Sequence, residues 1–361
     1  ESHQKSSLPG FDNPSPGARV HPTGYLKGNT MRVVVLGATG LLGSGITRVL
    51  ASRGHTVCAV ARGNRQVVLP EGVQFTPTDR RDRAAMEHLV KSFRPDAVVD
   101  CVAYTREDGI IDRDVFAGKV AHLIMVSTDF VYKPSFQVLP ITEDAPVRAG
   151  TAYSEGKVDC EEVLLRAREL QVTVIRPPHI MGPGGKLGSG SIQGRDSSLI
   201  DRVRKGVPIV LIDAGIHLLQ PLHVDDAGDA VNAILCNTAC FGKVYNVCGP
   251  VADLTRRYYE VIAETLGVPL QTLSIAGDIW VAARPDQVSF ARHRVYSLER
   301  IHTDTGWFPA ITMETSVRRT VADILARGED VPYVPSQAEE RLLAALSRHS
   351  AEIRGILASL G

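Results

Sequence analysis

The sequence has little of what marks several specialised classes of protein. Its net charge is zero, with 40 Lys and Arg residues against 40 Asp and Glu residues. It therefore lacks the basic field that attracts nucleic acids, and no nucleic-acid partner is expected. The longest apolar runs have only the length of a strand, so no membrane span is predicted.

Cysteine is also scarce, with six among 361 residues. Cys58, Cys101 and Cys248 fall inside predicted strands, and buried thiols of this kind are typical of a reduced, cytoplasmic protein. Cys236 and Cys240 are four residues apart, but no second pair follows them. No metal site is therefore predicted.

A 44% hydrophobic content in 361 residues is enough for one large or two coupled globular units. Residues 1–30 are rich in Pro, Gly, Ser and Asn without apolar periodicity, which predicts a flexible N-terminal tail. The tail has no apolar core of the kind that a secretory signal needs. Met31 lies directly before the first predicted strand, as a start codon would.

Residues 31–176 alternate between apolar strands and helices. Strands are predicted at residues 31–36, 56–61, 73–76, 97–102, 121–127 and 172–175, with helices through residue 50, over 83–93 and from residue 153 to about 170. This alternation predicts a doubly wound parallel sheet of the Rossmann type, with helices on both faces. It defines a dinucleotide-binding domain.

The pattern changes after residue 176. A long loop over 177–195 and a helix over 197–205 begin a smaller, interleaved substrate lobe, assigned to residues 177–206 and 251–330. Residues 207–250 are expected to return in part to the sheet. Residues 331–361 form a C-terminal segment of one or two amphipathic helices, and the loop and lobe are expected to determine which substrate binds.

The first strand is followed by a glycine-rich turn, Gly37-Ala-Thr39-Gly40-Leu41-Leu-Gly43. Glycines here let the backbone approach a pyrophosphate and let the helix pack on the strand. The start of that helix offers free N–H groups to phosphate. The turn therefore predicts a dinucleotide site.

The end of the second strand distinguishes the two nicotinamide cofactors, because an acidic residue there holds a ribose 2′-hydroxyl. This chain has Arg62 and Arg65 instead, and guanidinium groups suit a 2′-phosphate. NADP is therefore predicted, with NAD as the alternative if the arginines are only surface charges. The remaining residues expected around the cofactor follow later strands: Asp79, Arg80, Val102, Ala103 and Pro177.

Tyr153-Ser-Glu-Gly-Lys157 places a phenol and an ammonium group four residues apart, on one face of a helix. A nearby Lys⁺ lowers a phenol pKa that is otherwise about 10. Such a tyrosine transfers a proton to or from a substrate oxygen near neutral pH.

These features together resemble the extended short-chain dehydrogenase/reductase superfamily, of the NAD-dependent epimerase/dehydratase type. The resemblance runs from about residue 31 to 328. Its landmarks occur in order: Gly37-Ala-Thr-Gly-Leu-Leu-Gly43, Thr78-Asp79-Arg-Arg-Asp82, Pro95-Asp-Ala-Val-Val-Asp100, Val126-Ser-Thr-Asp-Phe-Val-Tyr132, Tyr153-Ser-Glu-Gly-Lys157, Arg176-Pro-Pro-His-Ile-Met-Gly-Pro183, Leu222-His-Val-Asp-Asp226, Tyr245-Asn-Val-Cys-Gly249 and Thr305-Gly-Trp307-Phe-Pro. The residues around Arg62 and Asp79 also resemble the branch of chloroplast stem-loop-binding proteins.

The resemblance implies the roles of several residues. Tyr153 would be the general acid/base, and Lys157 would hold the nicotinamide ribose. Thr128 would bind the reacting oxygen, with Ser127 as a stand-in, and Tyr104 would lie beside the substrate. Relatives also dimerise through the helix after the fourth strand and the Tyr153 helix, so a homodimer is expected.

Other positions depart from the superfamily. Dehydratases carry Thr-Asp-Glu where this chain has Thr128-Asp129-Phe130, so the base that starts elimination is missing. Asp129 remains as an acid or as a loop cap. Gln220 lies in a region where sugar-nucleotide epimerases have an arginine, which puts a nucleotide-sugar substrate in doubt.

Two further substrate contacts are considered, each with an alternative. His179 stands where epimerases often have Asn, and it is either a substrate contact or a structural histidine. Arg284 is either an anion ligand from the second lobe or a surface charge.

Two functions follow. The first is a nicotinamide-dependent oxidoreductase or epimerase acting on a hydroxyl or carbonyl group of a polar, sugar-like and possibly nucleotide-linked compound. The alternative is a non-catalytic dinucleotide-binding protein with a regulatory or RNA-associated role. An intact set of Tyr153, Lys157 and Thr128 favours the enzyme, because a pure binder has no chemical need for it.

Overall fold

A computed structural model describes residues 30–64, 68–136, 138–189, 192 and 194–360. Apart from Thr30, the predicted N-terminal tail lies outside the described residues, and so does Arg65. Within the described part of the chain, no helix combines the length and the apolar content that crossing a membrane requires.

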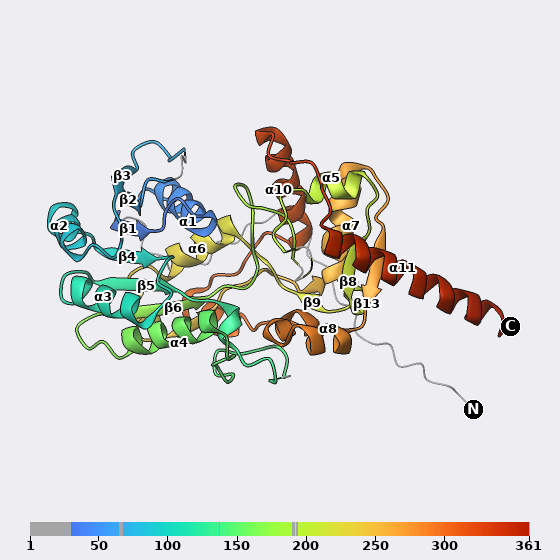
Figure 1. The fold of residues 1–361 in the computed structure, drawn as a ribbon. Coiled ribbons are helices and arrows are strands. Elements are labelled where there is room, and N and C mark those ends of the chain that lie inside the picture. Colours follow the sequence, from blue (N-terminus) through green and yellow to red (C-terminus); the bar gives the residue numbers. More distant parts are fainter. Residues whose placement is uncertain (1–29, 65–67, 137, 190–191, 193, 361) are drawn as a thin grey trace, which may run out of the picture.

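The larger part of the molecule is built on a parallel sheet, as the sequence predicted, and the sheet has seven strands (Figure 1). All its pairings are parallel, in the order β11-β6-β5-β4-β1-β2-β3. The strands are β1 (Arg32–Leu36), β2 (Thr56–Ala61), β3 (Gln74–Pro77), β4 (Ala97–Asp100), β5 (His122–Val126), β6 (Val172–Arg176) and β11 (Val244–Asn246). The strand order reverses between β1 and β4, which is where ligands bind in open α/β sheets.

Helices cover both faces of this sheet. Val33 and Val35 face one side, which is covered by α1 (Leu41–Ser52) and α6 (Val224–Ile234). Val34 and Leu36 face the other side. That side is covered by α2 (Arg83–Phe93), α3 (Arg106–Phe116) and α4 (Ala152–Leu165). The alternation follows from the two-residue period of a strand.

One helix is shorter than the sequence predicted. We expected α4 to reach about residue 170, but it ends at Leu165. The carbonyl of Glu169 accepts a hydrogen bond from the Gly118 amide, and Leu170 is buried in the core. These contacts hold the segment as a loop that leads directly into β6.

The smaller lobe lies beyond the carboxyl ends of the strands (Figure 1). Its core is formed by α5 (Leu199–Arg204), α7 (Thr255–Leu266) and α10 (Met313–Arg327) against β8 (Ile209–Ile212). β8 pairs with β13 (Thr272–Ile275) in a separate two-stranded sheet. The remaining elements of the lobe and its connections are β7 (Ile180–Met181), β9 (Leu218–Leu219), β10 (Leu222–His223), β12 (Asp253–Leu254), α8 (Gly277–Ala283) and α9 (Glu299–Thr305), with 3₁₀ turns at Asp129–Val131, Asp213–Gly215, Thr238–Cys240 and Pro285–Ala291.

The C-terminal segment is a single helix, α11 (Gln337–Ala358). It extends away from the body of the molecule (Figure 1), and none of its residues is buried. Ile356 and Leu357 are 55% and 60% exposed. The helix is tied to the smaller lobe near its start, where Glu339 pairs with Arg202.

Candidate active site

A cavity of about 460 Å³ opens at the carboxyl ends of β1, β2 and β4. This volume is typical of a small-molecule or cofactor site. Its lining includes most of the residues that the sequence assigned to a dinucleotide. The lining residues are Leu36, Gly37, Thr39, Gly40, Val60, Ala61, Arg62, Asn64, Thr78, Asp79, Arg80, Arg81, Val102 and Tyr104.

The glycine-rich turn has the shape that a pyrophosphate site requires. A Cβ atom on Gly43 would lie 2.3 Å from the Gly37 carbonyl oxygen, so no other residue fits there without moving the turn. Helix α1 begins at Leu41, with no side-chain cap and no acidic residue in its first turn. Its first N–H groups therefore remain available to a phosphate. The residues present fit a dinucleotide.

Two of the predicted cofactor residues point elsewhere. Arg80 borders the cavity, but its guanidinium is buried and pairs with Asp100, Asp108 and Asp112 at 3.0, 2.8 and 2.5 Å. Ala103 is fully buried in the sheet core. The assignment of these two residues to the cofactor site stays a prediction, with the Arg80 guanidinium held by the three aspartates.

Arg62 borders the cavity with an exposed side chain and no ion pair among the described residues. Arg81, which the sequence reasoning missed, also borders it and is 60% exposed, although it pairs with Asp108 at 2.9 Å. The Asp79-Arg-Arg-Asp82 motif was the available signal, but it did not reveal which arginine faces the cavity. Pro177 lies on the other side of the cleft, where its carbonyl accepts the Asp129 amide at 3.1 Å.

Helix α4 carries the Tyr153 motif on its first turns. Thr151 and Ser154 form a reciprocal capping box that fixes the start of the helix. A Cβ atom on Gly156 would lie 2.4 Å from the Tyr104 carbonyl oxygen. The glycine therefore lets α4 approach the loop after β4 closely, and the Tyr153 and Tyr104 rings lie 6.3 Å apart.

The position of Lys157 corrects one expectation. Its Nζ atom donates a 2.8 Å hydrogen bond to the Val126 carbonyl and lies 4.5 Å from the Tyr104 ring centroid. Tyr153 is 46% exposed as a residue, but the partial burial of its phenol raises the pKa to about 12, although a hydrogen bond with Thr128 opposes the rise. The phenol is therefore less easily ionised than the sequence suggested, and the Lys157 ammonium is directed at Val126 and Tyr104.

Thr128 and Ser127 are neighbours in sequence, but their hydroxyl groups have different hydrogen-bond partners. The Thr128 hydroxyl contacts Tyr153 and lies 3.3 Å from the Asp129 carboxylate. Ser127 instead donates its hydroxyl proton to Glu161, which also pairs with Arg176 at 2.6 Å. Of the two hydroxyls, only that of Thr128 adjoins the phenol.

Asp129 and Phe130 lie where β5 meets the smaller lobe. Asp129 is buried and accepts a 2.6 Å hydrogen bond from the Tyr296 phenol. Burial raises the pKa of Asp129, while Arg294 and the Tyr296 hydrogen bond lower it. Phe130 packs 5.8 Å from Phe290, ring centroid to ring centroid. Side chains from the smaller lobe thus complete this side of the site.

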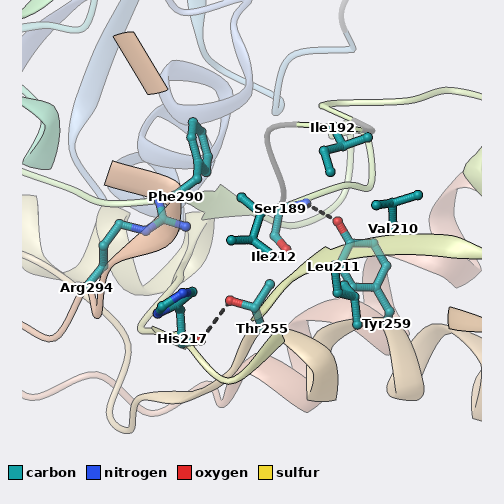
Figure 2. A pocket seen from close by; sticks show the side chains of 10 residues that line it. All are labelled: Ser189, Ile192, Val210, Leu211, Ile212, His217, Thr255, Tyr259, Phe290 and Arg294. Carbon is teal, nitrogen blue, oxygen red and sulfur yellow. Dashed lines mark hydrogen bonds between the residues drawn. The ribbon is translucent and has the colours of Figure 1, made fainter. Parts of the chain in front are cut away.

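Figure 2 shows a second cavity, inside the smaller lobe. Apolar and aromatic walls surround a few polar groups. The lining residues are Ser189, Ile192, Val210, Leu211, Ile212, His217, Thr255, Tyr259, Phe290 and Arg294. Sequence reasoning singled out none of these, because the side chains come from five separate segments that only folding brings together.

Of the six residues predicted to contact the substrate, five line neither of these two cavities, and Tyr104 is the exception. Gln220 is buried, and its amide bridges the Gly249 carbonyl and the Tyr296 amide, both at 2.8 Å. Its assignment as a substrate contact stays a prediction, and its amide has a structural role in holding Gly249 and Tyr296. Arg284 is exposed and pairs with Asp286 at 3.7 Å.

His179 packs edge-on against Tyr258, with 6.0 Å between ring centroids. Its Nε2 atom is buried without a hydrogen-bond partner among the described residues. Burial, with the charges of Arg195 and Arg294, holds the pKa of His179 well below its usual value. The ring is therefore neutral at physiological pH.

The comparisons with known proteins agree with this architecture. The family model "NAD dependent epimerase/dehydratase family" matches residues 33–248. The 2′-dehydrokanamycin reductase of Streptomyces kanamyceticus is 28% identical over 265 residues, which cover 73% of this chain and 74% of that protein.

A second relative belongs to the branch that the sequence suggested. It is the chloroplast stem-loop binding protein of 41 kDa b from Arabidopsis thaliana, which is 25% identical over 231 residues, 60% of this chain and 58% of that protein. The crystal structure of the Thermotoga maritima UDP-glucose 4-epimerase with UDP-glucose matches with a TM-score of 0.68 at 20% identity, and covers 82% of this chain and 99% of that one. A likeness at this identity shows the fold.

The sheet, the glycine turn and the adjoining Tyr153 helix define a nicotinamide-dependent enzyme on a Rossmann-type fold. The chain belongs to the NAD-dependent epimerase/dehydratase family. It is an NAD(P)-dependent oxidoreductase or epimerase of the short-chain dehydrogenase/reductase superfamily, as the sequence predicted.

Proposed function

We propose that the protein uses NADP to interconvert a hydroxyl and a carbonyl group on a polar, sugar-like compound, with Tyr153 as the general acid/base. The observation that carries the proposal is that Tyr104, which lines the cavity, lies against both the Lys157 ammonium and the Tyr153 ring. Thr128 in turn contacts the Tyr153 phenol. Relatives and neighbours that include a UDP-glucose 4-epimerase support a sugar-like substrate.

Each residue has a definable task in this chemistry. The nicotinamide supplies or accepts the hydride when the cofactor is bound. Tyr153 donates its proton to the carbonyl oxygen during reduction, and its pKa of about 12 keeps that proton in place at neutral pH. Thr128 adjoins the phenol and would donate a hydrogen bond to the same substrate oxygen. Lys157 is buried and holds its charge close behind Tyr104.

NADP is favoured over NAD because Arg62 offers an exposed guanidinium at the edge of the cavity. Asp79, also at that edge, is placed to meet the adenine. A guanidinium binds a 2′-phosphate through charge-assisted hydrogen bonds. The chain carries no acid beside Arg62, over Ala61–Asn64, that would hold a 2′-hydroxyl instead.

The direct test uses Tyr153→Phe with reduced NADP that carries deuterium at the nicotinamide C4 atom. Wild-type protein should transfer the label to the carbonyl carbon of a sugar-like ketone. The variant should lose roughly 10²–10⁴-fold in rate, as is typical when a general acid is removed, with cofactor affinity nearly unchanged. Near-normal turnover by the variant would show that Tyr153 is not the acid.

A homodimer through α3 and α4 also belongs to the proposal. These helices lie side by side on one outer face of the sheet (Figure 1). Light scattering on the purified protein tests this, and a monomeric mass at micromolar concentration would contradict it.

A further inference from the structure

Arg294 is a largely buried cation that forms no direct ion pair with the described residues, although its charge acts on the buried Asp129 carboxyl. Its residue is only 7% exposed, and no carboxylate among the described residues lies within 4.0 Å of its side-chain nitrogen atoms. The described side chains also supply no hydrogen bond to its guanidinium. Its one close contact is the Phe290 ring, whose centroid lies 5.1 Å from Cζ. Burying a charge without a partner is costly, so this guanidinium is suited to bind an anion.

The backbone around Arg294 is firmly held. Its amide donates to the Leu218 carbonyl at 2.9 Å, and the residue forms a parallel bridge with Leu219. Two residues on, Tyr296 is anchored through Asp129 and Gln220. The guanidinium is therefore presented from a fixed frame.

The side chain points into the smaller-lobe cavity (Figure 2). Three other polar groups border the same space, namely His217, Thr255 and Ser189, while Phe290 and Tyr259 form aromatic walls. The cavity encloses about 20 Å³, room for only one or two waters. Only a narrow terminal group fits, not a whole nucleotide.

His217 and Thr255 are positioned by other contacts. His217 Nε2 lies 2.9 Å from the Asp213 carboxylate, and the Thr255 hydroxyl donates to the His217 carbonyl at 2.8 Å. Asp213 is in turn bound to the Gly277 amide. Arg294 is thus the cation at this cavity that has no acidic partner.

The field of Arg294 also extends to the catalytic cleft. Its charge opposes the rise that burial causes in the pKa of Asp129. Asp129 adjoins Thr128, and Thr128 contacts Tyr153. A group bound at Arg294 therefore lies next to the cleft in which the carbonyl reacts.

We propose that Arg294 is a specificity-determining residue that binds a terminal carboxylate or phosphate of the substrate in this cavity. The inference rests on the proposed function, which supplies the sugar-like substrate. It adds that this substrate carries an anionic group. The guanidinium prefers an anion over a neutral hydroxyl because it binds an anion through charge-assisted hydrogen bonds.

A tryptophan reporter tests binding without any turnover. The chain has two tryptophans, and Trp280 packs in the small cluster that includes Ile212 and Phe290 at the cavity wall. Trp307→Phe therefore leaves one fluorophore, packed in the cluster that contains the cavity-lining residues Ile212 and Phe290. Inorganic phosphate and malonate are titrated separately into this parent variant, with chloride holding the ionic strength constant.

A saturable change in Trp280 emission is expected with at least one anion, and the arm that responds distinguishes a phosphate from a carboxylate. Adding Arg294→Gln should weaken binding roughly tenfold to a hundredfold, the loss expected for a charge-assisted hydrogen bond. Arg294→Lys keeps the charge and should retain part of the affinity, which separates a lost anion contact from a disturbed fold. Arg292→Gln removes an exposed neighbouring arginine and should leave the titration unchanged.

Equal affinity in the Arg294→Gln protein, or no saturable change in the parent with either anion, would overturn the proposal. Tyr153→Phe should titrate like the parent, because anion binding needs no proton transfer. Failure of the catalytic proposal and failure of the anion site therefore give different results.

Discussion

The phenol of Tyr296 donates a 2.6 Å hydrogen bond to the buried carboxylate of Asp129. Tyr296 comes from the smaller lobe, and Asp129 follows the fifth strand of the sheet. The bond joins the two parts of the molecule directly beside Thr128. The ionisation of Asp129 therefore depends on a residue more than 160 positions away in the chain.

Tyr296→Phe should raise the pKa of Asp129 above its present, already raised value, because the lost hydrogen bond favours the carboxylate. The change should cost about 1–3 kcal/mol of stability. The cost should be larger at pH 8 than at pH 4, since the bond matters most to the ionised form. Carboxyl ¹³C NMR and urea unfolding measure the two effects.

Tyr132→Phe is the matched control for this change. Its phenol is also buried and donates a 2.6 Å hydrogen bond, but to Asn246. A similar loss of stability is expected without a shift in the Asp129 titration. If both variants shift Asp129 equally, the Tyr296 bond is not what sets its pKa.

The Tyr153 phenol should stay protonated in the cofactor-free protein well beyond neutral pH, because burial raises its pKa to about 12. With ¹³Cζ-labelled tyrosine, its resonance, assigned by its loss in Tyr153→Phe, should keep its protonated position up to about pH 10.5. An unperturbed tyrosine, with a pKa of about 10, would be mostly ionised there. A titration midpoint of Tyr153 near pH 7 would contradict this prediction and would support the sequence-based expectation that Lys157 lowers the pKa of the phenol.

Helices and strands were predictable from the sequence where apolar residues recur with a regular period. The helix over residues 83–93 and the strand over 56–61 have the predicted bounds, because burial on one or both faces leaves a regular pattern. The glycine turn and Tyr104 border one cavity because parallel strands end at one edge of the sheet.

Side-chain direction was not predictable from the sequence. The sequence motif assigned Arg80 to the cofactor. In the structure its guanidinium instead donates hydrogen bonds to three aspartates that lie 20 to 32 residues further along the chain. Gln220 is held by Gly249 and by Tyr296, which is 76 positions away. Contacts between residues far apart in the chain produce no local sequence pattern. The surroundings of Arg294 could not be predicted for the same reason.

Arg62→Glu should weaken NADP binding by roughly tenfold or more, through the loss of a charge-assisted partner and the gain of a like charge. NAD binding should be unchanged or stronger, because a carboxylate accepts a ribose hydroxyl. Arg53→Glu is the control, since Arg53 is also exposed but pairs with Asp229 outside the cavity. Titration of both cofactors into each variant measures this, and a wild-type preference for NAD would contradict the arginine interpretation.

The carboxylate of Asp108 should contribute to the stability of the fold next to the cofactor cavity. Burial alone would raise the pKa of this carboxyl, but hydrogen bonds from Arg81 and the Tyr104 amide, with the charge of Arg80, lower it to about 2. The folded state thus favours the carboxylate. Its contribution is present above the ordinary pKa of about 4 and is lost as the pH falls toward 2.

Asp108→Asn should lower the free energy of unfolding at pH 7 by about 3–5 kcal/mol, because it leaves Arg80 short of one buried counter-charge. The difference from wild type should shrink between about pH 4 and pH 2 as the wild-type carboxyl gains its proton. Asp114→Asn on the same helix is the control, since Asp114 is partly exposed and pairs with Arg83 and Arg113, and exposed pairs contribute about 0–1 kcal/mol. Urea unfolding at pH 7, 4 and 3 measures both variants. A difference for Asp108→Asn that stays the same at all three pH values would show that the carboxylate charge is not what stabilises this corner of the cavity.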